Sequence, residues 1–88
     1  MNTKRAKACG TYLQDGTFKI YAGSEFSPME ESSCTDGIHK IRQRLLDKGI
    51  VVNDRFVKDV VIPSSSTAAK VILGYSADGY RVWKKQDQ

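Results

Sequence analysis

The chain has 88 residues, a length that accommodates one domain with one modest hydrophobic core. Hydrophobic residues make up 40% and charged residues 27% of the sequence, a balance that argues against wholesale disorder. No apolar run approaches the roughly 20 residues of a membrane span, and no apolar segment follows the basic start. We therefore expect a cytoplasmic protein without a membrane segment or a secretory signal.

The sign of the charge alternates along the chain, and this arrangement is more informative than the net charge of +4. Residues 23–36 contain four acids and no base, whereas residues 37–58 contain six bases and two acids. Such segments predict separate acidic and basic surface patches. A basic patch favours a polyanionic partner such as nucleic acid.

Cys9 and Cys34 are the two cysteines, and His39 is the single histidine. Two cysteines without a secretion signal predict free thiols in a reducing compartment. Because no CxxC spacing is present, a tetrahedral zinc site is not predicted, and we expect neither a metal nor another cofactor.

Residues 1–8 are polar and basic and show no hydrophobic periodicity. They are predicted to form a flexible basic arm, followed by a single domain over residues 9–85 and a tail over residues 86–88. An arm of this kind can grip phosphates, although an ordinary solvated tail explains the same composition.

Two β-rich runs flank Asp15-Gly16, the dipeptide best suited to a type I′ hairpin turn. A two-residue turn at this point pairs Leu13 with Phe18 and Tyr12 with Lys19. Leu13 and Phe18 then belong to the core face, and the opposite face carries a tyrosine and a lysine that can stack on a base and hold a phosphate. The β-propensity of tyrosine explains its presence equally well.

Residues 24–36 are rich in serine, proline and acids and are predicted to form an exposed loop. Glu25, Glu30 and Glu31 in this loop are candidate protein-contact residues, because an acidic segment without bases can mimic phosphate against a basic enzyme surface. Ordinary solvation of a loop explains the same acids.

The clearest predicted helix covers residues 37–49, with Thr35 or Asp36 as its N-cap and a glycine at its C-terminal end. Apolar residues recur at helical spacing at positions 38, 41, 45 and 46. Lys40, Arg44 and Lys48 recur every four residues, so their side chains line one exposed flank. This flank is a candidate phosphate-binding surface, although the pattern is also typical of a solvated helix face.

Residues 50–62 are predicted to form two strands, or one strand with a turn at Asn53-Asp54. Within this segment Lys58 is a further candidate phosphate contact. Residues 63–74 follow as a short second helix, which a serine of the Ser64–Ser66 run caps and Gly74 closes.

Aromatic and basic residues interleave most densely in residues 75–85. Asp78-Gly79 marks a turn, and residues 80–84 are predicted to form a last strand in which Trp83 anchors the core. The neighbouring side chains are available for stacking and for phosphate contacts. The complete set of candidate nucleic-acid-binding residues is Lys40, Arg44, Lys48, Lys58, Tyr75, Tyr80, Arg81, Lys84 and Lys85.

The sequence contains no Walker loop, GxSxG elbow, HExxH motif or spaced carboxylate pair. We therefore expect no catalytic residues, no enzyme activity and no small-molecule substrate. The expected fold is α+β, with a small antiparallel sheet (the N-terminal hairpin plus two or three later strands) packed with two helices.

Several short motifs follow one another in the order of a known module. They are Gly10-x-Tyr12, Asp15-Gly16-x-Phe18, Gly23-Ser24, Arg44-Leu45-Leu46, Pro63-Ser64-Ser65-Ser66-x-Ala68-Ala69, Gly74-x-Ser76-x-x-Gly79 and Trp83-Lys84. Over residues 9–85 this order resembles an uncharacterised domain found at the C-terminus of GIY-YIG endonucleases and beside restriction–modification proteins. The second half is similar to the RAMA (restriction-enzyme adenine-methylase-associated) domain. The resemblance implies an accessory to DNA-processing enzymes that binds DNA without cutting it.

We therefore expect a non-catalytic nucleic-acid-binding accessory module linked to DNA processing or to restriction and defence systems. DNA is favoured over RNA as the partner. The alternative is a protein-binding module or inhibitor, for example one encoded by a phage or mobile element, that acts on a restriction or CRISPR enzyme.

Overall fold

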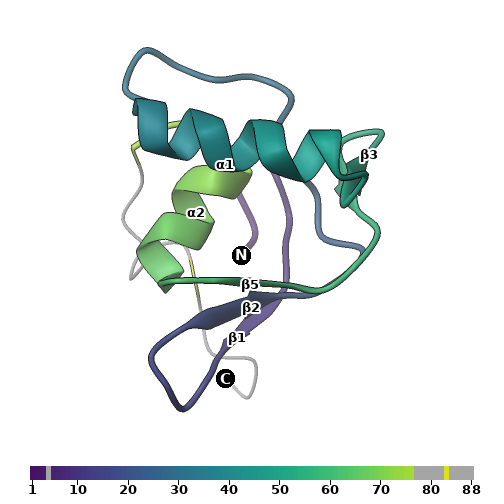
Figure 1. Cartoon of the computed structure of the whole chain (residues 1–88), viewed down its shortest axis with the longest axis vertical. Coiled ribbons are helices and arrows are strands. Elements are labelled where there is room, and N and C mark those ends of the chain that lie inside the picture. Colours follow the sequence, from purple (N-terminus) through teal and green to yellow (C-terminus); the bar gives the residue numbers. More distant parts are fainter. Residues whose placement is uncertain (4, 77–82, 84–88) are drawn as a thin grey trace.

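Two helices and five short strands are found in the computed structural model, which describes residues 1–3, 5–76 and 83 (Figure 1). This arrangement confirms the predicted α+β class. In chain order the elements are β1 (Gly10–Tyr12), β2 (Phe18–Ile20), α1 (Asp36–Asp47), β3 (Val51–Val52), β4 (Arg55–Phe56), β5 (Val60–Ile62) and α2 (Ser65–Leu73).

The strands form two antiparallel sheets. In the first sheet β2 lies between β1 and β5, and in the second β3 pairs with β4. α2 contacts β2 and β5 as well as α1, so it lies between the long helix and the three-stranded sheet (Figure 1). The buried apolar residues of β2, β5 and α2 are Phe18, Ile20, Ile62, Ala68, Ala69, Val71, Ile72 and Leu73.

The first hairpin turns in a different way from the two-residue turn that the sequence predicts. A type I′ turn needs positive φ at both central residues, but only Gly16 (φ +89°) has it, and Asp15 does not. The loop is longer, because the Leu13 N–H donates to the Thr17 carbonyl at 2.9 Å. The Asp15 carboxylate accepts a hydrogen bond from the Thr17 N–H at 3.0 Å and so stabilises this loop.

The longer loop shifts the register by one residue. Tyr12 pairs with Phe18, and Thr11 pairs with Lys19. Paired residues share a face, so Tyr12 lies beside Phe18, with the two rings edge to face at 5.1 Å between centroids. The predicted face that combines Tyr12 with Lys19 is therefore wrong.

The type I′ geometry occurs instead between β3 and β4. Asn53 and Asp54 both have positive φ, at 52° and 61°, in the turn that the sequence predicts at this dipeptide. The chain then leaves this hairpin and joins the other sheet as β5, whose Val60 pairs with Ile20.

Both helices lie within about two residues of the predicted bounds, although Lys48 and not Gly49 is the C-cap of α1. The Thr35 side chain caps α1 by accepting from the Ile38 N–H, and Ser64 caps α2 by accepting from the Thr67 N–H at 3.1 Å. α2 is closed by Gly74 in the left-handed conformation (φ 75°). A Cβ at this position would also collide with the Met29 carbonyl, so the close approach of the acidic loop requires glycine.

The segment of residues 1–8 is predicted to be a flexible arm, but its described residues pack on the domain. Ala6 and Ala8 are buried in the core. The Lys7 N–H donates to the Glu25 carboxylate and the Lys7 carbonyl accepts from the Glu25 N–H, both at 2.8 Å. Ala6 and Ala8 are two residues apart, so in an extended segment they lie on the same face, and their small side chains fit a close-packed interior. The polar residues around them make this pattern hard to recognise in the sequence.

At the other end, Trp83 is buried, and its indole N–H donates to the Ser65 carbonyl at 2.9 Å. This burial confirms the core role predicted for Trp83. The turn predicted at Asp78-Gly79 lies outside the described residues, as do the rest of the strand predicted over residues 80–84 and the tail over residues 86–88. Within the described ranges, no helix combines the length and the apolar character needed to cross a membrane.

Candidate nucleic-acid interface

Three of the predicted phosphate contacts lie together on the exposed flank of α1. Lys40, Arg44 and Lys48 are all exposed, and with His39 and Gln43 they line an open hollow along the helix. In the described part of the chain, four contacts closer than 4.0 Å join a basic side chain to an acidic one, and none of them involves these three cations. Their charges are therefore available to an anionic partner.

The lining of this hollow also contains one acid. Asp47 lines the same hollow and accepts a hydrogen bond from the Gln43 amide at 3.2 Å. Three cations and one carboxylate leave the flank with a net positive charge, which suits a phosphate-binding surface.

The opposite side of α1 is held in place by an arginine. Arg42 follows Ile38 at helical spacing on the buried face and is only 2% exposed. Its guanidinium donates to the carbonyls of Ser27 and Val71 and to the Glu30 carboxylate, at 3.1 Å for the last. The guanidinium also lies over a phenylalanine ring, 4.1 Å from its centroid.

A buried arginine is stable only when its donors are satisfied, and here protein acceptors surround it. The bonds of Arg42 connect α1 to the acidic loop and to α2, and they fix which flank of α1 faces outward. Arg42 is thus a positioning residue for the basic flank. Its polar side chain hides this role in the sequence, but its place in the 38–42–45 stripe on the buried face is a signal that indicates it.

Glu30 connects the loop to α1 through both carboxylate oxygens. One lies 2.7 Å from His39 Nδ1 and the other accepts from Arg42. Burial of the Glu30 carboxyl raises its pKa, but the hydrogen bonds from His39 and Arg42 outweigh this effect and hold the pKa below the ordinary value. The carboxylate is therefore ionised at neutral pH and paired within the chain.

The other two candidate protein-contact acids are paired in the same way. Glu31 accepts from the Arg5 guanidinium, and Glu25 forms an ion pair with Arg55 at 3.5 Å. The loop that the sequence predicts as a free acidic patch is therefore largely neutralised by cations of the same chain. Each of these acids thus has a cation of the same chain beside it, which reduces the negative charge that the loop offers to a partner.

The remaining candidates do not join the α1 flank. Arg5 covers one face of the Tyr75 ring, 4.8 Å from its centroid, so this tyrosine is already stacked within the molecule. Lys58 is exposed in the loop between β4 and β5, outside the hollow along α1. Four further candidates, Tyr80, Arg81, Lys84 and Lys85, lie outside the described residues.

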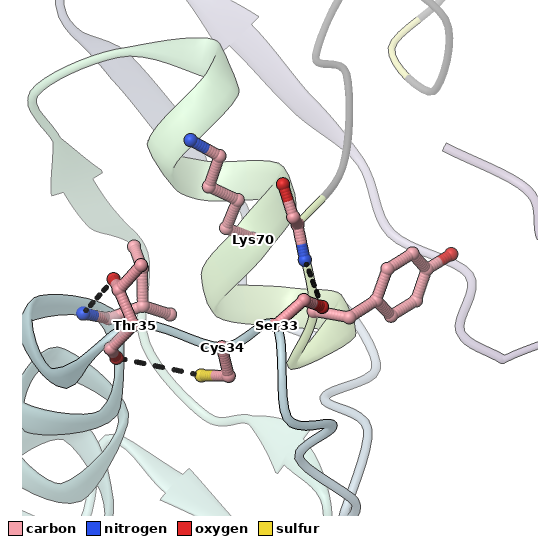
Figure 2. Close-up of a pocket in the computed structure, with 7 residues that line it drawn as sticks. Ser33, Cys34, Thr35 and Lys70 are labelled. Atoms are coloured by element: carbon pink, nitrogen blue, oxygen red, sulfur yellow. Dashed lines mark hydrogen bonds between the residues drawn. The ribbon is translucent and has the colours of Figure 1, made fainter.

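A small pocket at the N-terminus of α1 does not provide a second site. Ser33, Cys34, Thr35 and Lys70 line it, and its volume of about 30 Å³ holds water molecules but no nucleotide (Figure 2). The Lys70 amine points away from the Cys34 sulfur in Figure 2. Burial raises the pKa of the Cys34 thiol, with a further contribution from Glu30, so the thiol stays protonated at neutral pH and is a poor nucleophile.

Among the described residues, no group of three or more histidine, cysteine or acidic side chains is arranged to hold a metal ion. Cys9 is exposed and Cys34 is half-buried, and both are free thiols.

The family model described as Domain of unknown function (DUF4357) matches residues 1–88, and the chain therefore belongs to this family. The match includes residues 1–8, in agreement with their packing on the domain. Neither a curated protein nor a solved structure matches the chain.

Proposed function

We propose that this member of the DUF4357 family is a non-catalytic nucleic-acid-binding accessory module whose α1 flank contacts phosphates. The observation that supports the proposal most directly is the set of three exposed cations on α1 that form no ion pair with described residues. The acids of the loop between β2 and α1 are paired with Arg5, Arg42 and Arg55 and leave these cations free.

The spacing of the cations suits a row of phosphates. Residues four apart on a helix are separated by about 6 Å along its axis, so Lys40 and Lys48 lie about 12 Å apart along the axis. Phosphates of DNA and of RNA both fit this spacing, and the resemblance to accessory domains of DNA-processing enzymes favours DNA. The described cations contact phosphates in this proposal, and binding by α1 is therefore largely independent of base sequence.

The cellular role follows from the resemblance that the sequence motifs carry. An accessory domain of DNA-processing or restriction enzymes needs affinity for DNA and no chemistry of its own, and we place its action in the cytoplasm. The inhibitor alternative receives less support, because the three loop acids on which it depends are already engaged within the chain.

Fluorescence anisotropy with a labelled duplex DNA tests the proposal. Each neutralised phosphate contributes a slope of about −0.9 to the dependence of log affinity on log salt concentration. Three contacts predict that the affinity falls roughly 40-fold between about 50 mM and 200 mM salt. No binding at the lower salt concentration, or a salt-independent affinity, would contradict the proposal.

Single substitutions assign the contacts. Lys40→Ala, Arg44→Ala and Lys48→Ala are each expected to weaken binding and to reduce the slope by about one. Lys7→Ala is the matched control, because it removes the same charge from an exposed position in the N-terminal segment. Equal effects of Lys7→Ala and the three α1 variants would show a general charge effect and not a defined interface.

A further inference from the structure

A groove between α1 and β5 lies beside the basic flank. It has a volume of about 280 Å³. Apolar side chains form most of its lining, namely Ile41, Leu45, Ile50, Val60, Val61, Ile62 and Pro63. The groove is thus an apolar surface at the edge of the domain, large enough to receive one or two side chains of a partner.

The apolar lining is accessible from outside. Val61 is 52% exposed although it belongs to a strand, and Pro63 beside it is also exposed. Ile41 and Ile50 are half-buried. Exposed apolar side chains that line one concave surface are typical of interaction sites and less typical of a solvated surface.

Two cations stand at this groove. Arg44 and Lys48 complete its lining, and the lining residues include no acid. Both side chains also line the hollow on the exposed flank of α1, so they form a ridge between the two surfaces. A partner that fills the groove therefore meets two positive charges next to its apolar contact.

We propose that this groove binds an extended segment of another protein in which an apolar side chain is flanked by aspartate or glutamate. The apolar side chain enters the groove, and the acids pair with Arg44 and Lys48. The acidic loop of a second copy of this chain is a poor occupant, because its glutamates are already paired with Arg5, Arg42 and Arg55. A nucleobase is also a poor occupant, because the lining offers no aromatic ring on which a base stacks.

This inference does not depend on the DNA-binding proposal, although Arg44 and Lys48 serve both surfaces. The two surfaces differ in their remaining residues. Lys40 belongs to the flank alone, and Val61 belongs to the groove alone. Substitutions at these two positions therefore separate the two activities.

A random peptide library displayed on phage provides the test. The library is selected on the wild-type protein and counter-selected on Val61→Asp, which places a negative charge in the groove. We expect the enriched peptides to carry an apolar residue flanked by acids. A selected peptide should bind Val61→Asp or Lys48→Glu at least about tenfold more weakly than wild type, because like charges repel acidic ligands, and should bind Lys40→Ala as wild type does.

Circular dichroism would reveal whether Val61→Asp fails to fold. In that case Lys48→Glu keeps the test valid, because Lys48 is exposed at the end of α1. The inference is overturned if no peptide is enriched, or if the enriched peptides lack acids or bind both groove variants normally. It is also overturned if single-stranded DNA, and no peptide, shifts the methyl signals of Ile41, Ile50 and Val61 in a nuclear magnetic resonance titration. If peptide binding is absent while Lys40-dependent DNA binding is retained, this inference alone is contradicted. If DNA binding is absent while peptide binding is retained, the proposed function alone is contradicted.

Discussion

Glu30 is the residue through which the acidic loop and α1 hold each other in place. Its carboxylate lies within hydrogen-bond distance of His39, at 2.7 Å, and of Arg42, at 3.1 Å. Arg42 is buried, whereas His39 lies on the exposed part of α1 next to Lys40. The ionisation of this single carboxyl group therefore affects how firmly the loop is attached to α1.

Replacement of Glu30 by glutamine is expected to make stability less dependent on pH. The pKa of Glu30 is lower in the folded protein than its ordinary value of 4.5, so the folded state favours the ionised carboxyl. The stabilisation is present above pH 4.5 and is lost as the pH falls through the folded pKa. Glu30→Gln should be less stable than wild type by about 1 kcal/mol at neutral pH, and the difference should shrink in acid.

Urea unfolding at a series of pH values measures this difference. Glu31→Gln is the matched control, because Glu31 is the adjacent carboxyl and pairs with Arg5 nearer the surface. A stability difference between wild type and Glu30→Gln that stays constant from neutral to acidic pH would show that the charge of Glu30 contributes nothing to folding.

At the scale of elements, a glycine in β1 and a glycine in α1 differ in whether they can accommodate a Cβ atom. A Cβ on Gly10 in β1 would collide with the Phe18 ring and the Lys19 carbonyl, whereas a Cβ on Gly37 in α1 meets no atom within 4 Å. Gly10→Ala is expected to destabilise the protein by about 1–3 kcal/mol through overpacking. Gly37→Ala should stabilise it by about 0.5–1 kcal/mol, because alanine has the higher helix propensity.

The expected changes in the free energy of unfolding have opposite signs, so chemical unfolding of both variants under the same conditions gives a clear result. The informative result is which of the two variants is the more stable. If Gly10→Ala proves as stable as Gly37→Ala, the β1–β2 register that places Gly10 opposite Ile20 is wrong.

The helices and the presence of the first hairpin could be predicted from the sequence, whereas the register of that hairpin could not. Caps and stop signals are local, and Thr35, Ser64 and Gly74 act where their residue types predict. The hairpin register depends on φ at Asp15, which aspartate can adopt with either sign. The hydrogen bond that the Asp15 carboxylate accepts from the Thr17 N–H favours the longer loop, and a one-residue change in loop length moves the side chains of β1 to the other face relative to β2.

The candidate site could likewise be predicted only where local sequence patterns determine it. The four-residue spacing of Lys40, Arg44 and Lys48 was sufficient to place them on one flank, because helix geometry alone determines it. The pairing of Glu30 with Arg42 joins residues twelve positions apart across a loop and a helix. No local pattern encodes such a contact, so the sequence suggested a free acidic patch where the structure shows an internal network.

At the scale of the whole molecule, the described charges are arranged so that one basic surface is left open. The N-terminal segment and the second hairpin each supply an arginine to the acidic loop, Arg5 to Glu31 and Arg55 to Glu25. The loop is therefore held at three points, counting Arg42 on α1. The net positive charge of the chain is thereby concentrated on side chains outside this network, including the flank of α1.

The N-terminal segment is consequently expected to be required for the stability of the whole domain. Deletion of residues 1–8 removes the buried Ala6 and Ala8, the backbone pairing with Glu25, and the hydrogen bond from Arg5 to the Leu73 carbonyl at 3.3 Å. These losses should lower the free energy of unfolding by about 2 kcal/mol or more, and the midpoint of thermal unfolding should fall. Lys7→Ala, in the same segment but with an exposed side chain, should unfold as wild type does. A truncated chain that unfolds at the wild-type temperature would show that the segment is the detachable arm that its polar composition suggests, and that the three-point attachment of the loop does not depend on Arg5.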